Sequence, residues 1–279
     1  MELAYLNGWL GSLEEAHVSV NDRGYNFGDG VYEVLRAYDG VIFALEEHLK
    51  RLESSAAAVE IELPWKPAQL KNITEDTLSK SGIKEALIYI QVTRGTAPRS
   101  HSSEADMLPN LLVTVRNIIE IPPSLYSEGV KAITMPEFRW QMCNIKSISL
   151  QASVLAKRRA DRAGAAEAFF VLPDGTVTEG ASSNIFIVKD GVLLTHPADN
   201  RILSGVLRHF VLKVAESLEV KVRVEPFKIS DLMKAEEVFI TGTVAEVVPV
   251  VNVDGKIIGG GQPGPLTGLL HQGFTSLHE

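Results

Sequence analysis

Tight-turn dipeptides set between apolar runs constrain this chain more than any other feature of its sequence. Asp39-Gly40 divides the run RAYDGVIFAL, and Asp190-Gly191 divides NIFIVKDGVLLTH. These dipeptides tolerate the positive φ angles that a two-residue hairpin turn requires, so each flanking pair of runs predicts two antiparallel strands. We therefore expect antiparallel pairing to dominate the sheets of the fold.

Further apolar runs and helical patterns lie between and around these hairpins. The other predicted strands are Ala86–Thr93, Leu111–Arg116, Val130–Thr134, Ala168–Leu172, Glu237–Thr241 and Val247–Val253. The predicted helices are Glu46–Val59, Gln151–Ala163, Leu203–Leu218 and Pro265–Leu277. Hairpins mixed with helices indicate an α+β fold rather than a doubly wound parallel sheet.

A proline-rich segment divides the chain. The stretch IIEIPPSLYSEG carries Pro122-Pro123 and ends in glycine, which is typical of a linker. We expect a small domain over residues 1–118, a linker over residues 119–129 and a larger domain over residues 130–279.

Charge and residue content exclude several classes of function. The formal net charge is -8, whereas binding to nucleic acid or anionic membranes needs a basic surface. The single Cys143 leaves no disulfide framework, the seven histidines show no metal-site spacing, and no apolar run reaches the ~20 residues of a membrane span. Because the N-terminus also lacks a basic, apolar leader, we expect a cytoplasmic protein without nucleic-acid, membrane or metal partners.

Lys146 is the only charged residue between Trp140 and Ala156. An ammonium among apolar and small polar neighbours is poorly hydrated, and poor hydration favours the neutral amine that attacks carbonyl groups. On these residues alone one alternative stays open, namely a lysine that reaches solvent from the end of a strand.

Three other segments carry groups suited to a flat, anionic ligand. Ser204-Gly205 precedes a predicted helix, whose first N–H groups attract anions. A predicted strand ends in Thr241, Gly242 and Thr243, and Glu179 is followed by small residues that let a ring approach the backbone. Taken singly, a helix cap, an ordinary turn and a solvated glutamate remain the alternatives.

Two segments of the N-terminal half add candidate substrate groups. Tyr32 lies on a predicted strand, with Glu33 directed to the opposite face. Arg99 and His101 lie two residues apart in a polar loop, so two cationic donors can face one carboxylate. A core aromatic residue and a solvated loop are the alternatives.

Taken together and in order, seven segments resemble the class IV aminotransferases, which are fold type IV enzymes dependent on pyridoxal 5'-phosphate (PLP). The segments are DRGYNFGDGVYEV, EHLKRL, QVTRGTAPRSH, NIKSISL, TVTEGASSNIF, THPADNRILSGVLR and FITGTVAEVVPV, spread over nearly the whole chain. The resemblance implies a small N-terminal α/β domain, a larger C-terminal domain with a mixed, barrel-like sheet core, and PLP between the two.

The resemblance also implies a role for each matching residue. Lys146 binds PLP as a Schiff base and shuttles a proton, and Glu179 pairs with the pyridine nitrogen of the cofactor. The residues implied to hold the phosphate and the ring are Arg51, Val206, Leu207, Thr243, Leu203 and Ser183. The residues implied to hold the substrate carboxylate are Tyr32, Arg99 and His101, and the loop that carries the last two comes from the neighbouring subunit of a homodimer.

Within the family, the pair Arg99 and His101 is similar to the arrangement in the bacterial transaminases of D-amino acids. We expect amino transfer from D-alanine or D-glutamate to 2-oxoglutarate or pyruvate. Branched-chain L-amino acid and (R)-amine transaminases, aminodeoxychorismate lyase and a non-catalytic binding module are the alternatives. Leu207 and Gly242 stand where related enzymes carry hydroxyl residues, which predicts looser binding of the phosphate.

Overall fold

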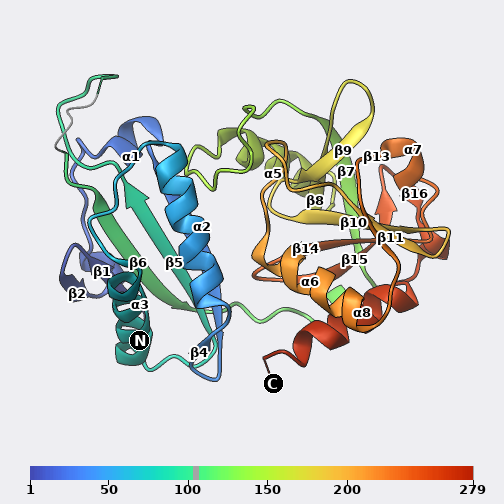
Figure 1. Cartoon of the computed structure of the whole chain (residues 1–279), viewed down its shortest axis with the longest axis horizontal. Coiled ribbons are helices and arrows are strands. Elements are labelled where there is room, and N and C mark those ends of the chain that lie inside the picture. The colour runs from blue at the N-terminus through green and yellow to red at the C-terminus, as the bar shows by residue number, and fades with distance from the viewer. Residues whose placement is uncertain (103–106, 279) are drawn as a thin grey trace. The chain divides into compact units, whose positions relative to one another are not determined.

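The chain divides into two units in the computed structural model, which describes residues 1–102 and 107–278 (Figure 1). Unit 1 comprises Met1–Ile119 and Ile145–Leu150. Unit 2 comprises Glu120–Asn144 and Gln151–Glu279. The short segment that contains Lys146 therefore belongs to unit 1, although the chain on both sides of it belongs to unit 2.

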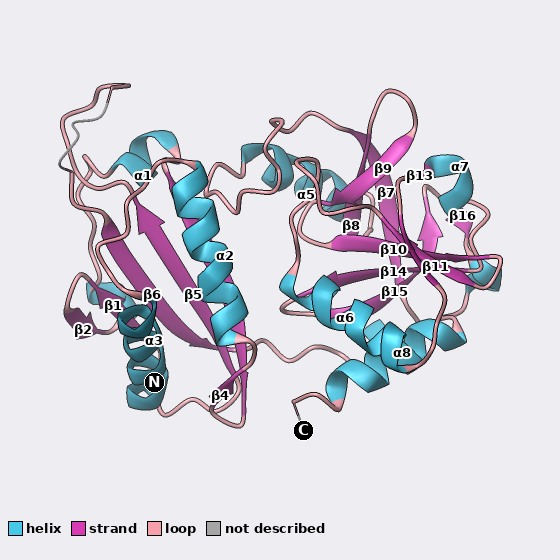
Figure 2. Cartoon of the chain, viewed as in Figure 1, coloured by secondary structure: helices cyan, strands magenta, loops and turns pink. Residues whose placement is uncertain are grey.

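Unit 1 is built on one antiparallel sheet in the order β2-β1-β6-β5-β3-β4. The strands are β1 (Leu3–Leu6), β2 (Trp9–Gly11), β3 (Gly30–Tyr38), β4 (Val41–Ile42), β5 (Ala86–Thr93) and β6 (Asn110–Asn117). The helices are η1 (Leu13–Glu15), α1 (Arg23–Phe27), α2 (Leu45–Ala58) and α3 (Pro67–Ser81). Helices α2 and α3 pack on the sheet and against each other (Figure 2).

The core of unit 1 follows from two sequence periods. Alternate residues of β5 are buried, because successive side chains of a strand point to opposite faces. On α2 the expected apolar face is confirmed, since Leu49, Leu52 and Ala56 are buried in the same cluster. The β3–β4 hairpin is also confirmed, with φ angles of 45° and 84° at Asp39 and Gly40.

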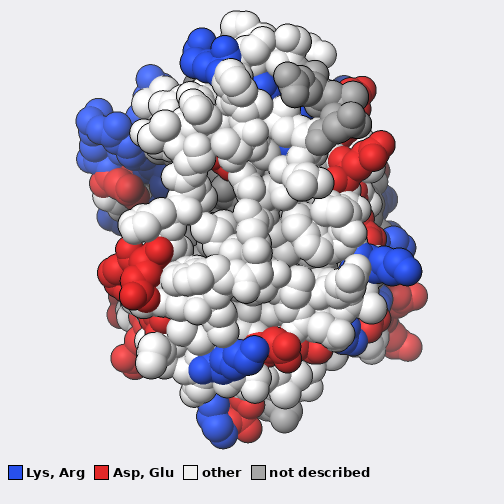
Figure 3. All heavy atoms as spheres, turned by 90° about the vertical axis from the view of Figure 1, so that its left-hand side faces the viewer, with Lys and Arg blue, Asp and Glu red and all other residues white. Residues whose placement is uncertain are grey.

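Unit 1 also exposes large apolar side chains. Trp9, Val18, Val20 and Tyr25 are among the exposed hydrophobic residues. Figure 3 shows a face on which most of the central area carries neither basic nor acidic side chains. Exposed apolar surface of this kind often marks an interaction site.

Unit 2 is built on a mixed sheet in the order β12-β11-β10-β14-β15-β7-β8-β9-β13, with β16 paired to β15. The strands are β7 (Val130–Pro136), β8 (Glu167–Val171), β9 (Thr176–Gly180), β10 (Asn184–Lys189), β11 (Val192–Thr195), β12 (Val222–Val224), β13 (Phe227–Lys228), β14 (Glu237–Gly242), β15 (Glu246–Val253) and β16 (Lys256–Ile257). The helices are α4 (Ser124–Ser127), α5 (Gln151–Arg162), α6 (Val206–Ser217), α7 (Ile229–Leu232), η2 (Gly259–Gly261) and α8 (Pro265–Thr275).

The sheet of unit 2 curls, and helices cover it from outside (Figure 2). Helix α5 packs against β7 and β8, while α6 and α8 pack against β14 and against each other. On β8, Phe169 joins one apolar cluster, whereas Ala168 and Phe170 join the other, which includes residues of α5. A strand covered on both faces reads as a continuous apolar run, as this one does.

The α+β expectation is confirmed, and the predicted strands and helices are found with small shifts at their ends. Helix α3 was not predicted, because its amphipathic pattern is interrupted by polar residues. The helix predicted from Leu203 begins only at Val206, because Gly205 is an extended N-cap. Lys146 does not lie on a regular strand; its segment makes only the isolated bridge between Ser147 and Val31.

Candidate active site

The backbone of Lys146 is fixed from two sides within unit 1. Tyr32 of β3 donates its N–H to the Lys146 carbonyl oxygen at 2.9 Å. The Lys146 N–H donates to Ser55 Oγ of α2 at 3.1 Å. Strand β4 pairs with Ala37 and Tyr38 at the C-terminal end of β3. The N-terminal end of β3 therefore leaves its edge accessible to the segment around Lys146, and Ser147 forms an isolated bridge with Val31 there.

The side chain of Lys146 lies against an aromatic ring. Its Nζ is 4.4 Å from the centroid of the Tyr32 ring, which in turn is 5.6 Å from the Tyr89 ring. An ammonium is attracted to the negative face of an aromatic ring. The structure therefore brings together two residues predicted for the site, one for cofactor attachment and one for substrate binding.

A buried ion cluster lies on the opposite side of β3. Glu33 is fully buried and accepts from Arg51 Nε and Nη2, both at 2.8 Å, while His48 Nδ1 lies 2.7 Å from it. Burial alone would raise the pKa of Glu33, but Arg51 and His48 outweigh it and lower that pKa to about 2. Burial lowers the pKa of His48, helped by the charges of Arg51 and Lys146. Arg51, predicted to hold phosphate, is thus oriented by Glu33.

Arg99 and His101 gather around Phe27, the last residue of α1. The Arg99 Cζ lies 5.0 Å from the Phe27 ring centroid, and the His101 ring centroid lies 5.6 Å from it. Arg23 holds the loop by donating to the carbonyl oxygens of Ser100 and His101 at 2.7 and 3.3 Å. Both predicted side chains are exposed in this chain. The side chains of Arg99 and His101 therefore both lie near the ring of Phe27.

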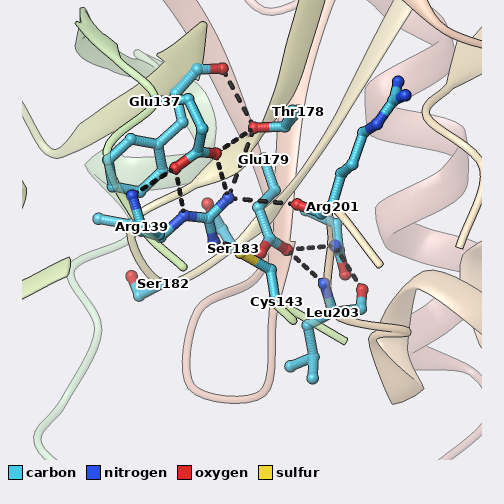
Figure 4. A network of polar contacts seen from close by, with 12 residues as sticks. Glu137, Arg139, Cys143, Thr178, Glu179, Ser182, Ser183, Arg201 and Leu203 are labelled. Carbon is cyan, nitrogen blue, oxygen red and sulfur yellow. Dashed lines mark hydrogen bonds and ion pairs between the residues drawn. The ribbon is translucent and has the colours of Figure 1, made fainter. Parts of the chain in front are cut away.

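Glu179, the predicted acid, lies near the end of β9 in unit 2 (Figure 4). Arg139 Nη1 donates to its Oε1 at 2.5 Å. Asn184 Nδ2 and the Leu203 N–H donate to its Oε2 at 3.1 and 2.9 Å. Ion pairing and N–H donors favour the charged form of a buried carboxyl group. Glu179 is therefore an anchored carboxylate and not a solvated turn residue.

The small residues after Glu179 wrap around a second buried carboxylate, Glu167. The hydroxyl groups of Ser182 and Ser183 donate to its Oε2 at 2.9 and 2.8 Å. A Cβ on Gly180 would lie 2.4 Å from Ser183 Oγ, so glycine is required there. Glu167 therefore sets the shape of the loop that includes Ser183.

The N-terminus of α6 offers an anion site. Its N-cap, Gly205, provides no side chain for the first N–H groups, which include those of Val206 and Leu207. Among the described residues, Thr241 Oγ1 is buried without a hydrogen-bond partner. Thr241 pairs in register with Asn184, and a Cβ on Gly205 would lie 2.0 Å from Asn184 Oδ1, so these groups meet at one corner. A helix N-terminus and an unpaired hydroxyl suit a phosphate group.

Several residues of these clusters were not predicted. Glu137 and Arg139 lie just before the apolar stretch around Lys146 and carry no local signal, because their partner Glu179 is distant in the sequence. His48 becomes notable only because burial isolates one of its ring nitrogens. Thr241, which was expected at the end of a strand, carries a buried hydroxyl without a hydrogen-bond partner among the described residues. Thr243, which was predicted, follows β14 and is half-buried.

In the described part of the chain, no group of three or more His, Cys, Asp and Glu side chains is arranged to hold a metal ion. None of its helices combines the length and apolar character needed to cross a membrane.

The chain is similar in sequence to known aminotransferases. The model of the amino-transferase class IV family matches residues 30–253. The D-alanine aminotransferase of Bacillus licheniformis is 43% identical over 262 residues, covering 94% of this chain and 92% of that protein. The corresponding enzyme of Staphylococcus haemolyticus is 39% identical over 279 residues, covering 100% of this chain and 99% of that protein.

A solved structure shares the fold. The T.th. branched-chain amino acid aminotransferase, solved with pyridoxamine 5'-phosphate, superposes with a TM-score of 0.93 at 30% identity. The match covers 98% of this chain and 93% of that one. The predicted fold class, with a small antiparallel sheet unit and a curled mixed sheet unit, is thereby confirmed.

Proposed function

This chain belongs to the amino-transferase class IV family, and from that premise we propose that it uses PLP to move amino groups from small D-amino acids to 2-oxo acids. Donors of the D-alanine and D-glutamate type and acceptors such as 2-oxoglutarate and pyruvate are the expected substrates. The observation that carries the proposal is the anchored carboxylate of Glu179, held by Arg139, Asn184 and Leu203. The similarity to D-alanine aminotransferases supports the choice of D-amino acids as donors.

The described residues fit PLP in chemical type. The cofactor needs a primary amine, an acid for its ring nitrogen and donors for its phosphate. Lys146 offers the amine, Glu179 the acid, and the first turn of α6 the N–H groups. The buried hydroxyl of Thr241 at the same corner lacks a partner among the described residues, which a phosphate oxygen would supply.

The chain contributes binding, orientation and proton transfer. When bound, PLP supplies an aldehyde that bonds covalently to amines and a ring that withdraws electrons. Lys146 would hold the cofactor through its Nζ, and the same amine, when free, would move a proton at the substrate Cα. Glu179 would accept a hydrogen bond from the ring nitrogen, and Leu203 and Ser183 would support the ring.

Phosphate and substrate are held by separate groups. The phosphate is bound by the N–H groups of Val206 and Leu207, by Thr243 and by Arg51, whose guanidinium Glu33 orients. The substrate carboxylate is bound by Tyr32, Arg99 and His101. This division leaves the amino group of the substrate for the chemistry.

The first experiment tests the cofactor. The purified protein is expected to be yellow with PLP, to be bleached by borohydride, and to lose colour and activity in Lys146→Ala. Loss of the base should slow turnover by at least ~10²–10⁴-fold. The matched control is Lys50→Ala, because Lys50 is exposed on α2 beside Arg51. A Lys146→Ala protein with wild-type turnover would refute the role of Lys146.

The second experiment tests the substrate. Separate incubation with D-alanine and L-leucine should give turnover of the D-amino acid only. Turnover of L-leucine without D-alanine would identify a branched-chain transaminase instead, and release of pyruvate from aminodeoxychorismate without an amino acceptor would identify a lyase.

We also propose that the protein acts as a homodimer in which Arg99 and His101 serve the neighbouring subunit. Their exposure in the single chain and the apolar surface of unit 1 support this. Mixing subunits of Lys146→Ala with subunits of the double variant Arg99→Ala/His101→Ala should restore activity, because a hybrid dimer would contain one complete site. No recovery after verified subunit exchange would contradict shared sites.

A further inference from the structure

Glu137 forms one end of a chain of charges that ends on Glu179 (Figure 4). Arg139 Nε and Nη2 donate to Glu137 Oε1 and Oε2 at 3.0 and 2.7 Å, and Arg139 Nη1 donates to Glu179 Oε1 at 2.5 Å. The guanidinium is thus shared between two carboxylates, one of which has been assigned to the cofactor ring. Glu137 itself has been given no role in the proposed reaction.

The packing around Arg139 allows it little freedom. Its guanidinium lies 4.3 Å from the centroid of the Phe170 ring, and its Nη2 also donates to the Arg201 carbonyl oxygen at 3.3 Å. Thr178 Oγ1 donates to Glu137 Oε2 at 3.1 Å. The side chains of Glu137 and Arg139 are 12% and 10% exposed, so water screens their charges only weakly. Both are therefore fixed charges in the surroundings of Glu179.

Glu137 and Arg139 hold their charges at neutral pH. Burial would raise the pKa of Glu137, but the hydrogen bonds and charge of Arg139 outweigh it and lower that pKa. Burial would lower the pKa of Arg139, and the two carboxylates outweigh it and raise that pKa. The pair therefore behaves as one unit that carries no net charge.

Other titratable groups also lie near Glu179. Arg208 is buried on α6, and the charge of Glu179 partly offsets the effect of burial, which lowers its pKa. Burial raises the pKa of Cys143 to about 11, so its thiol is neutral. Glu167 is a further buried carboxylate beside the loop that follows Glu179. Whatever the sum of these charges, loss of the Glu137 charge would leave Arg139 paired with Glu179 alone and would make the surroundings of Glu179 more positive by one charge.

A positive charge beside Glu179 disfavours the protonation of any nearby group that becomes a cation when it binds a proton, because like charges repel each other. A pyridine nitrogen that bears a proton is such a cation. We propose that Glu137 is a positioning residue for the cofactor ring: by neutralising Arg139, it allows Glu179 to keep the pyridine nitrogen of PLP protonated. This inference rests on the proposed function, since it assumes that Glu179 faces that nitrogen.

The test follows the nitrogen itself and does not depend on turnover. PLP labelled with a nitrogen isotope in its ring is bound to the wild type and to variants, and nitrogen NMR follows the protonation of the ring against pH. Glu137→Gln removes the charge and keeps the shape, so its titration midpoint should fall by about one pH unit, or about tenfold in the ratio of the two forms. Glu137→Asp keeps the charge and should titrate as the wild type does.

Each outcome bears on the inference. An unchanged midpoint in Glu137→Gln would overturn it, and so would a Glu137→Asp variant that behaves like Glu137→Gln, because geometry and not charge would then be responsible. If Glu137→Gln does not fold, Arg139→Gln provides the test. Removal of this cation should raise the titration midpoint of the ring nitrogen, and an unchanged midpoint would refute the effect of charge. A wild type that binds no PLP would instead refute the proposed function, and this inference with it.

Discussion

The buried carboxylate of Glu33 should make unit 1 sensitive to acid in a measurable way. Glu33 accepts two hydrogen bonds from Arg51 and faces His48, with no exposed surface. We consider the substitution Glu33→Gln, which keeps the size of the side chain and removes its charge. Because Arg51 and His48 remain, the variant removes the charged carboxylate that both of them face.

The magnitude follows from the pKa of Glu33. A carboxyl group whose pKa is lower in the folded chain stabilises the fold above its unfolded pKa, and this stabilisation is lost as the pH falls toward the folded value. A change from 4.5 to about 2 corresponds to about 3 kcal/mol, at about 1.4 kcal/mol per pKa unit. Glu33→Gln should therefore be about 3 kcal/mol less stable than the wild type above about pH 5, and the gap should close toward about pH 2.

His48 contributes with the same sign. Its pKa is also lowered by burial from 6.5, so the unfolded chain binds more protons and stability decreases as the pH is lowered through this range. The wild type should therefore begin to lose stability below about pH 6.5. This loss should be larger in Glu33→Gln, because Glu33 raises the pKa of His48 and so partly offsets the effect of burial.

The assay has to report on unit 1 alone. The chain contains three tryptophans, of which Trp9 and Trp65 lie in unit 1 and Trp140 lies in unit 2. In a Trp140→Phe background, tryptophan fluorescence during urea unfolding follows unit 1, and the free energy of unfolding is measured at several pH values.

An exposed carboxylate of the same unit provides the control. Glu62→Gln removes an exposed carboxylate from the same unit and should change the free energy of unfolding by less than about 0.5 kcal/mol. A gap between the wild type and Glu33→Gln that stays constant with pH would show that packing, and not charge, makes the difference. That result would refute the reasoning.

Three further predictions follow from close contacts at the site. Phe27→Leu removes the ring that supports Arg99, so the KM for the amino donor should rise about tenfold with little change in kcat; an equal fall in kcat and in kcat/KM would contradict a role in binding alone. Gly205→Ala places a Cβ 2.0 Å from Asn184 Oδ1, so the midpoint of thermal unfolding and the affinity for PLP should both fall, by about 1–3 kcal/mol in stability, and an unchanged melting curve would argue against this contact. Gly242→Ser is sterically allowed, since its nearest neighbour is 3.6 Å from the added Cβ, and its hydroxyl should slow the release of PLP measured by dilution; release at the wild-type rate would show that the missing hydroxyl is unimportant.

Local patterns in the sequence were sufficient for most elements of the fold. The hairpin turn at Asp39-Gly40 and the apolar face of α2 depend on neighbouring residues, whose backbone angles and spacing are written directly in the chain. The seven ordered motifs likewise indicated the family, because each motif is a short continuous segment. Helix α3 was missed, since three of its five buried residues, Thr74, Thr77 and Ser81, are polar and its buried face therefore lacks an apolar period.

The charges around the site were decided only by the tertiary structure. Sequence reasoning selected Glu179 and Leu203 but not Arg139 or Glu137, because Arg139 lies on a different segment and Glu137 reaches Glu179 only through Arg139. It placed Arg51 in the site without the buried Glu33 that orients it. The sequence by itself determined which residue types are present and which local conformations they favour. The folded chain decided which charges are removed from water and face one another, since the strength of each interaction depends on burial and distance and not on position along the chain.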